Sequence, residues 1–146
     1  MRKITKEIAD AFKVYRTISR GNTQVKICDI WGDEIAVYLH GNKILWKTLA
    51  NEIHFNMRGW GTVTTRERLN GLFEVLELPL NIRQIDFCQR INIEPSTRES
   101  NVSIFDTHEL LISRTYVWFV KEKYLCLEQD VEEANSLLKK EVTANV

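Results

Sequence analysis

Apolar residues first recur along this chain at the spacing of a helix, and the segments that follow are typical of strands. In ITKEIADAFKVY, residues 4–15, apolar residues recur every three or four positions, which predicts an amphipathic helix with Thr5 as its N-cap. The segments TQVKICDIW, EIAVYLH, KILWK and NEIHFNMRGW follow up to residue 60 and are short and rich in β-branched and aromatic residues. They predict a β-meander.

A second helical pattern starts within RGWGTVTTRERLNGL, residues 58–72. Apolar residues recur at helical spacing from Thr65, and Pro79 disfavours helical geometry in the residue before it. Thr64 and Glu67 fit a capping box, in which each side chain accepts a hydrogen bond from the other residue's backbone N–H. We therefore expect a central helix after the TTRERLN segment, with its N-cap at Thr64.

The second half of the chain predicts further strands and a last helix. QIDFCQRINIE, VSIF, ELLIS and TYVWFVKEKYLCLE, within residues 84–128, have strand composition, with a hairpin turn at VKEKY. DVEEANSLLKKEV, residues 130–142, predicts a short C-terminal helix capped by Asp130. The fold class is α+β, a mainly antiparallel sheet packed with three helices. Without an internal repeat or a further boundary, the 146 residues predict a single domain, 1–146.

Composition narrows the possible functions. Twenty basic residues balance twenty acidic ones, which disfavours a nucleic-acid partner and leaves only local basic patches. No apolar run is long enough for a membrane span or a secretory signal, so a cytoplasmic protein is expected. The three cysteines are widely spaced and predict neither a disulfide framework nor a zinc site, so we interpret them as small buried residues. The three histidines are scattered and predict no metal site. No catalytic or cofactor motif occurs, so neither an enzyme nor a cofactor is expected.

The stretch that opens the central helix has features of an anion site. Helix N-termini carry free N–H groups and a partial positive charge, and here Arg58 and Trp60 approach the helix start between flanking glycines. Guanidinium groups beside an aromatic face can pair with phosphate while a base stacks on the ring. A second basic and polar turn, residues 20–23, could complete a pocket. The alternatives are an ordinary helix start and an ordinary helix-to-strand turn.

Two segments resemble a pattern found in small bacteriophage-encoded proteins. LHGNKILW and GWGTVTTRERLNGL are similar to a "hGNxIA" turn followed by "GWxTxTTxxRLNxL", and ITKEIADAF with GNTQV is similar as well. Leu45 stands where the pattern has alanine, and the resemblance covers roughly the first half of the chain. Among phage anti-defence proteins, the chain most resembles the Thoeris anti-defence protein 1 type.

That resemblance implies a function without catalysis. It implies a homo-oligomer in the cytoplasm of the infected host that sequesters a cyclic ADP-ribose signal, or a cyclic oligonucleotide, without cleaving it. The expected phosphate and base contacts are Arg20, Asn22, Arg58, Trp60, Thr64, Thr65, Arg68 and Asn70. Two other classes stay open: an inhibitor of a host defence or regulatory complex that acts by protein contact, and a nucleic-acid-binding accessory protein with strongly salt-dependent binding.

Overall fold

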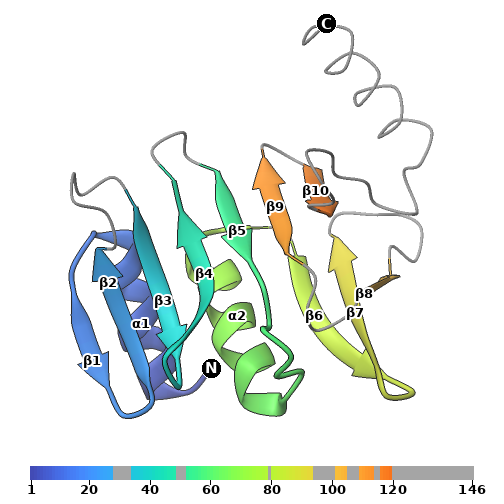
Figure 1. Cartoon of the computed structure of the whole chain (residues 1–146), viewed down its shortest axis with the longest axis horizontal. Helices are drawn as coiled ribbons and strands as arrows, with labels where there is room; N and C mark the ends of the chain where they lie inside the picture. Colours follow the sequence, from blue (N-terminus) through green and yellow to red (C-terminus); the bar gives the residue numbers. More distant parts are fainter. Residues whose placement is uncertain are drawn as a thin grey trace, which may run out of the picture.

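Two antiparallel sheets and two helices make up the part of the chain that the structure, a computed structural model, describes: residues 1–27, 34–48, 52–78, 80–93, 101–104, 109–113 and 116–119. One sheet has seven strands in the order β1-β2-β3-β4-β5-β9-β10, and the other has the order β6-β7-β8 (Figure 1). This confirms the predicted α+β class. The elements are α1 (Lys3–Lys13), β1 (Ile18–Arg20), β2 (Thr23–Ile27), β3 (Ile35–Leu39), β4 (Asn42–Lys47), β5 (Ile53–Phe55), α2 (Val63–Val75), β6 (Leu80–Ile85), β7 (Cys88–Ile93), β8 (Asn101–Ile104), β9 (Leu110–Ser113) and β10 (Tyr116–Phe119).

Several predicted boundaries differ from the structure. The first helix starts two residues before Thr5, so Thr5 is not its N-cap. Thr5 is fully buried inside the helix, and its hydroxyl pairs with α2. The segment QIDFCQRINIE is part of a hairpin that turns at residues 86–87, and residues 18–20 form β1 where no strand was expected. The predicted C-terminal helix and the VKEKY turn lie outside the described residues.

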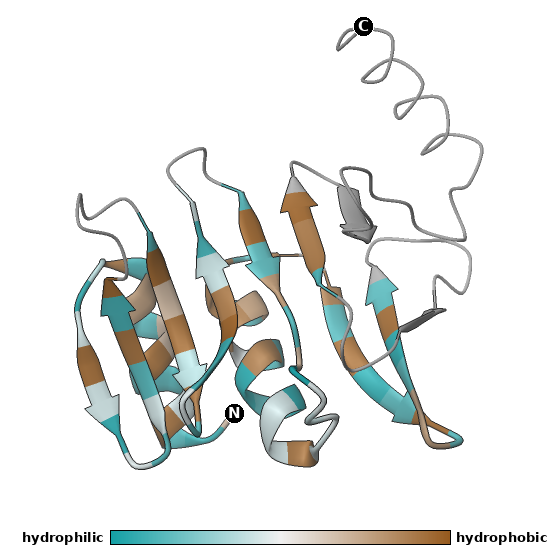
Figure 2. Ribbon diagram, viewed as in Figure 1, coloured by the Kyte–Doolittle hydropathy of each residue, from teal (hydrophilic) through white to brown (hydrophobic). Residues whose placement is uncertain are grey.

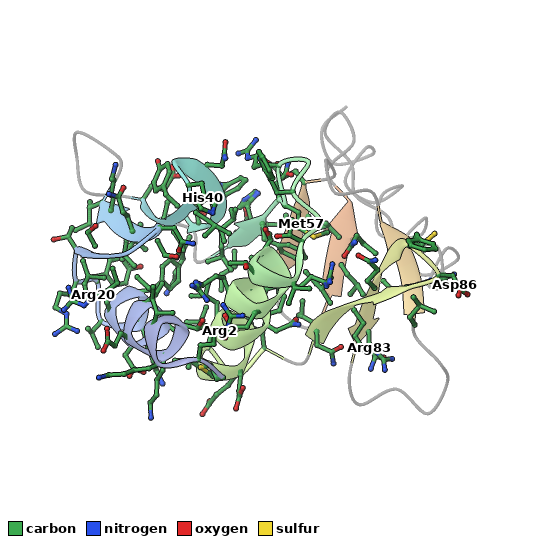
Figure 3. All side chains as sticks on the ribbon, turned by 90° about the horizontal axis from the view of Figure 1, so that it is seen from below. Arg2, Arg20, His40, Met57, Arg83 and Asp86 are labelled. Carbon is green, nitrogen blue, oxygen red and sulfur yellow. The ribbon has the colours of Figure 1, made fainter. Side chains whose placement is uncertain are left out.

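Both helices pack on the same face of the seven-stranded sheet, as the view from below shows (Figure 3). Helix α1 contacts β1, β2 and β3, whereas α2 contacts β4 and also β6 of the second sheet. Hydrophobic and hydrophilic residues alternate along β5 (Figure 2), where one face of the strand is buried, whereas β3 and β4 each have three consecutive buried residues. Helix α2 therefore joins the two sheets. No helix in the described ranges is both long and apolar enough to cross a membrane.

The core is one cluster of buried apolar side chains that includes residues of both helices and both sheets. At its centre Phe55 of β5 meets Phe73 of α2 edge to face, with the ring centroids 5.1 Å apart. The rings are fully buried, and an aromatic pair of this kind is worth about 0.5–1.5 kcal/mol beyond its buried area. This contact fixes the side of α2 that faces the sheet.

The two helices approach closely at Gly71. A Cβ atom at this position would lie 2.2 Å from Cγ2 of Thr5, which is far inside van der Waals contact. Thr5 is stiff at χ1 and completely buried, so it cannot move aside cheaply. The glycine therefore sets the distance between α1 and α2, and it brings the Thr5 hydroxyl within reach of charged groups on α2.

Candidate functional site

A pocket of about 250 Å³ lies at the start of α2. Its walls come from the end of β3, the turn into β4, the segment after β5 and the first turn of α2. The lining residues are Leu39, His40, Asn42, Ile44, Met57, Trp60, Thr62, Thr64 and Thr65. Three predicted contacts, Trp60, Thr64 and Thr65, are thus brought together here, along with hydroxyl, amide and imidazole groups.

Two tight turns shape this pocket. His40 and Gly41 join β3 to β4 with positive φ angles of 50° and 78°, as a two-residue hairpin turn requires. Arg58 and Gly59 also have positive φ angles, and the Trp60 N–H then donates to the Met57 carbonyl at 2.9 Å. This second turn leaves the Trp60 side chain 58% exposed at the pocket, where a ligand could stack on it.

The helix begins earlier than the capping-box prediction placed it. Thr62 is the N-cap, and its hydroxyl oxygen accepts from the Thr65 N–H at 3.3 Å. The prediction of Thr64 as the cap is wrong because Val63 already has helical geometry, and Glu67 does not reach back to it but points to α1. Thr64 is consequently inside the first turn and lines the pocket.

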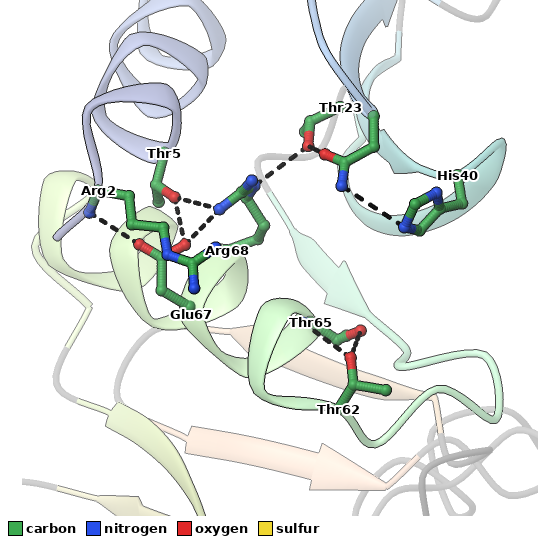
Figure 4. A network of polar contacts seen from close by, with 9 residues as sticks. Arg2, Thr5, Thr23, His40, Thr62, Thr65, Glu67 and Arg68 are labelled. Atoms are coloured by element: carbon green, nitrogen blue, oxygen red, sulfur yellow. Dashed lines mark hydrogen bonds and ion pairs between the residues drawn. The ribbon is translucent and has the colours of Figure 1, made fainter.

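Arg68, a predicted phosphate contact, is buried between the helices and 3% exposed. Its Nε donates to the Thr23 hydroxyl at 3.1 Å, and Nη1 donates to the Thr5 hydroxyl at 2.8 Å and pairs with the Glu67 carboxylate (Figure 4). Thr5 and the Arg2 backbone N–H also donate to Glu67. The guanidinium of Arg68, which was predicted to contact a phosphate, instead holds α1, α2 and β2 together.

The same network shifts the acidity of Glu67. Burial of this carboxyl raises its pKa, but hydrogen bonds from Thr5, the Arg2 N–H and Arg68, together with the Arg68 charge, outweigh burial. The pKa of Glu67 is therefore lower in the folded chain than its ordinary value of 4.5. Because the unfolded chain binds this proton more tightly, the carboxylate stabilises the fold above that value, and the stabilisation is lost as the pH falls through the folded pKa.

We expect the Glu67→Gln variant to be less stable than the wild type near pH 7, because an amide cannot neutralise the buried Arg68 charge. As the pH falls below 4.5 and through the lower pKa of Glu67 in the folded chain, this stabilisation is lost and the difference in the free energy of unfolding should shrink. Urea denaturation at a series of pH values between 7 and 3 measures this difference. Parallel curves for the two proteins would contradict the assignment.

Asn70 also has a structural role. Its Nδ2 donates to the Ile82 carbonyl at 2.8 Å, and its Oδ1 accepts from the Ile82 N–H at 2.7 Å. Because β6 is an edge strand, the backbone N–H and carbonyl of Ile82 have no strand beside them, and the Asn70 side chain takes both hydrogen bonds instead. Asn70 thus attaches the second sheet to α2, and it is not among the residues that line the pocket.

The two other predicted arginine contacts, Arg58 and Arg20, interact with other parts of the protein. Arg58 Nε donates to the Lys43 carbonyl at 2.8 Å, and its guanidinium lies over the Trp46 ring at 5.4 Å. Arg20 pairs with Glu7 of α1 at 3.1 Å. Neither arginine lines the pocket.

Asn22, by contrast, is next to the pocket. Its side-chain Nδ2 lies 3.5 Å from His40 Nε2, and its backbone carbonyl accepts a hydrogen bond from the His40 backbone N–H at 2.8 Å. Sequence reasoning missed His40, Asn42 and Met57 as lining residues. The HGN turn was recognisable, but its proximity to the start of α2 was not. Cys88 is exposed, contrary to the expectation of a buried cysteine, and the other two cysteines lie outside the described residues.

The chemistry offered by this pocket is that of binding. Hydroxyl groups, an amide and an imidazole can donate or accept hydrogen bonds, and the first N–H groups of α2, which have no intrahelical acceptor, can donate to an anion. Within the described ranges, no three histidine, cysteine or acidic side chains are placed to hold a metal ion.

A family model described as Kyanoviridae Gp96 protein matches residues 1–136. No curated protein and no solved structure matches the chain. The match extends well past the first half of the chain, where the sequence motifs lie.

Proposed function

The chain belongs to the Kyanoviridae Gp96 protein family, a family of bacteriophage proteins, and on that premise we propose that it binds and sequesters a nucleotide immune signal of the host. The ligand class proposed is a cyclic ADP-ribose-type molecule or a cyclic oligonucleotide, as for the Thoeris anti-defence type, in the cytoplasm of the infected bacterium. The protein holds the signal without cleaving it. The observation that carries the proposal is the pocket at the start of α2, with Trp60 exposed beside threonine hydroxyls.

The pocket chemistry supports a nucleotide ligand in two ways. Trp60 presents an aromatic face on which a base can stack, a contact worth about 1–3 kcal/mol. The N–H groups of Val63 and Thr64 are in the first turn of α2, where no intrahelical acceptor exists, so they can donate to a phosphate. Positive charge comes from the helix dipole, because the predicted arginines are engaged elsewhere.

The pocket size limits how much of the ligand is enclosed. Its volume of about 250 Å³ is below the roughly 300–1,000 Å³ of drug-sized ligand sites. We therefore assign one nucleotide unit to the pocket, with the rest of the molecule outside it across Trp60. Binding alone meets the need of a sequestering protein.

Removing the Trp60 ring tests this assignment. We expect Trp60→Ala to weaken binding of cyclic ADP-ribose isomers or cyclic dinucleotides about 5- to 150-fold, from the stacking energy lost. Thr64→Val should weaken binding as well, since it removes a hydroxyl and keeps the shape of the side chain. Isothermal titration against both probe classes measures the affinities, and the variants should stay folded because Trp60 is exposed.

Tyr15→Ala is the matched control, because Tyr15 is also an exposed aromatic residue but is not in the pocket. The bound nucleotide should be recovered intact after denaturation, as chromatography can show. Conversion of the nucleotide would contradict sequestration. Failure of every probe to bind or to raise the melting temperature would overturn the proposal.

A second candidate is direct inhibition of a host complex by protein contact. Trp60 and Val63 are 58% and 65% exposed and three residues apart, so the same region offers an apolar surface. Co-purification with a host protein that is lost in Trp60→Ala, without any effect of nucleotides, would favour this candidate.

A further inference from the structure

A chain of hydrogen bonds runs from the buried ion pair between the helices to the pocket at the start of α2 (Figure 4). Arg68 Nε donates to the Thr23 hydroxyl at 3.1 Å, and that hydroxyl donates to Oδ1 of Asn22 at 2.8 Å. The Asn22 side chain then meets His40, with its Nδ2 3.5 Å from Nε2 of the ring. His40 lines the pocket, so the chain ends where a ligand would bind.

Chemistry fixes the direction of each hydrogen bond in this chain. A guanidinium group can only donate, so the Thr23 oxygen accepts the proton of Arg68. The single hydroxyl proton of Thr23 is then donated to Asn22, and only the oxygen of that amide can accept it. The oxygen of the Asn22 side chain therefore faces Thr23, and its NH2 group faces His40.

This orientation decides which nitrogen of His40 carries a proton. The NH2 group of Asn22 is a donor, so Nε2 of His40 must be the acceptor and is unprotonated. The one proton of the neutral ring is therefore on Nδ1, because the hydrogen bond of one ring nitrogen sets the state of the other. Free histidine prefers its proton on Nε2, so the fold selects the opposite tautomer.

The hydrogen-bond chain starts in the rigid core, although His40 itself is exposed. Arg68 is 3% exposed and Thr23 is completely buried. The backbone N–H of His40 donates to the backbone carbonyl of Asn22 at 2.8 Å, which keeps these two residues side by side. Buried groups thus hold the amide of Asn22 in the orientation that His40 meets.

We infer that His40 is a specificity-determining residue of the pocket and offers the ligand a proton donor at Nδ1. Within the described part of the chain, this nitrogen has no hydrogen-bond partner. A carbonyl oxygen or an unprotonated ring nitrogen of a base can accept from it, whereas an amino group cannot. The inference rests on the proposed function, because it names the kind of base edge that the nucleotide pocket selects.

Nitrogen NMR of the free full-length chain tests the tautomer without any ligand. At about pH 8, well above the usual pKa of histidine, long-range correlations to the ring protons distinguish a protonated Nδ1 from a protonated Nε2. The chain has three histidines, and the His40→Asn variant identifies the His40 signals by their loss. We expect the proton on Nδ1 in the wild type. A ring protonated mainly at Nε2 would overturn the inference.

The Asn22→Asp variant should reverse the tautomer. A carboxylate can only accept, so Nε2 of His40 must then carry a proton. Gln24→Glu is the matched control, because it makes the same change on β2 in a side chain that contacts Ser19 and not His40. It should leave the tautomer as in the wild type. An unchanged His40 ring in Asn22→Asp would show that Asn22 does not set its protonation.

Two replacements of His40 separate the roles of its ring nitrogens. The amide of asparagine reaches the position of Nδ1, whereas that of glutamine reaches the position of Nε2. In isothermal titration with cyclic ADP-ribose and with cyclic di-AMP, His40→Gln should weaken binding about fivefold more than His40→Asn, the effect of one hydrogen bond. The φ angle of His40 is 50°, so melting temperatures of both variants are compared to exclude a disturbed turn.

The outcomes separate this inference from the proposed function. If the wild-type chain binds a probe and both replacements weaken binding equally, the role of His40 is wrong while the proposed function stands. If neither probe binds the wild-type chain, the proposed function fails and the ligand role of His40 fails with it.

Discussion

Replacement of Arg68 by methionine should lower the free energy of unfolding by about 3–5 kcal/mol, the range measured when one partner of a buried ion pair is removed. The guanidinium is 3% exposed and the partner carboxylate of Glu67 is 20% exposed, so solvent replaces little of the lost interaction. Thr5 and Thr23 also lose their donor. Urea denaturation at pH 7 measures the effect.

Arg16→Met is the control for Arg68→Met, because it removes an exposed arginine and should change stability by no more than about 0.5 kcal/mol. The double variant Glu67→Gln with Arg68→Met should be less destabilised than the sum of the two single changes, since no unpaired charge remains. A loss below about 1 kcal/mol in Arg68→Met would contradict the structural assignment. A loss of ligand binding in this variant would follow from unfolding, so Arg68 is not a suitable probe of the pocket.

Replacement of Phe73 by alanine should destabilise the protein by about 3–5 kcal/mol. The ring is fully buried on α2 and packs against Phe55, so its removal leaves a cavity where the helix meets the large sheet. Phe87→Ala removes the same group from a 95% exposed position and should change the stability of the monomer by about 0.5 kcal/mol at most. Equal effects of the two changes in denaturation at low protein concentration would contradict the proposed core.

The sequence predicted most of the first half of the fold. Helical spacing located α1 and α2, and strand composition located β2, β3, β4 and β5, because one face of each element is buried in the same core. The division of QIDFCQRINIE into parts of two strands was missed because Asp86 and Phe87 are not typical turn residues. The resemblance to bacteriophage proteins is confirmed by the family match, whereas the anti-defence type stays a proposal.

The candidate site was located by sequence only in part. Trp60, Thr64 and Thr65 were expected to lie together because they are neighbours along the chain, and all three line one pocket. Arg68 and Asn70 were expected to face a ligand. That expectation was open to error because a sequence does not show which groups of the fold surround a polar side chain. The structure shows both hydrogen-bonded within the protein.

What the sequence by itself determined was the set of local elements and their apolar faces, since helix and strand periodicities depend on residues close together along the chain. Only the tertiary structure decided the partners of the polar groups. The Thr23 contact to Arg68 and the placement of His40 beside the first turn of α2 join residues far apart in sequence. The packing of α1, α2 and the sheet decides that Arg68 is buried in an ion pair and that Trp60 is exposed at the pocket. A buried polar group must find a partner inside the protein, and only the packing determines which partner is near.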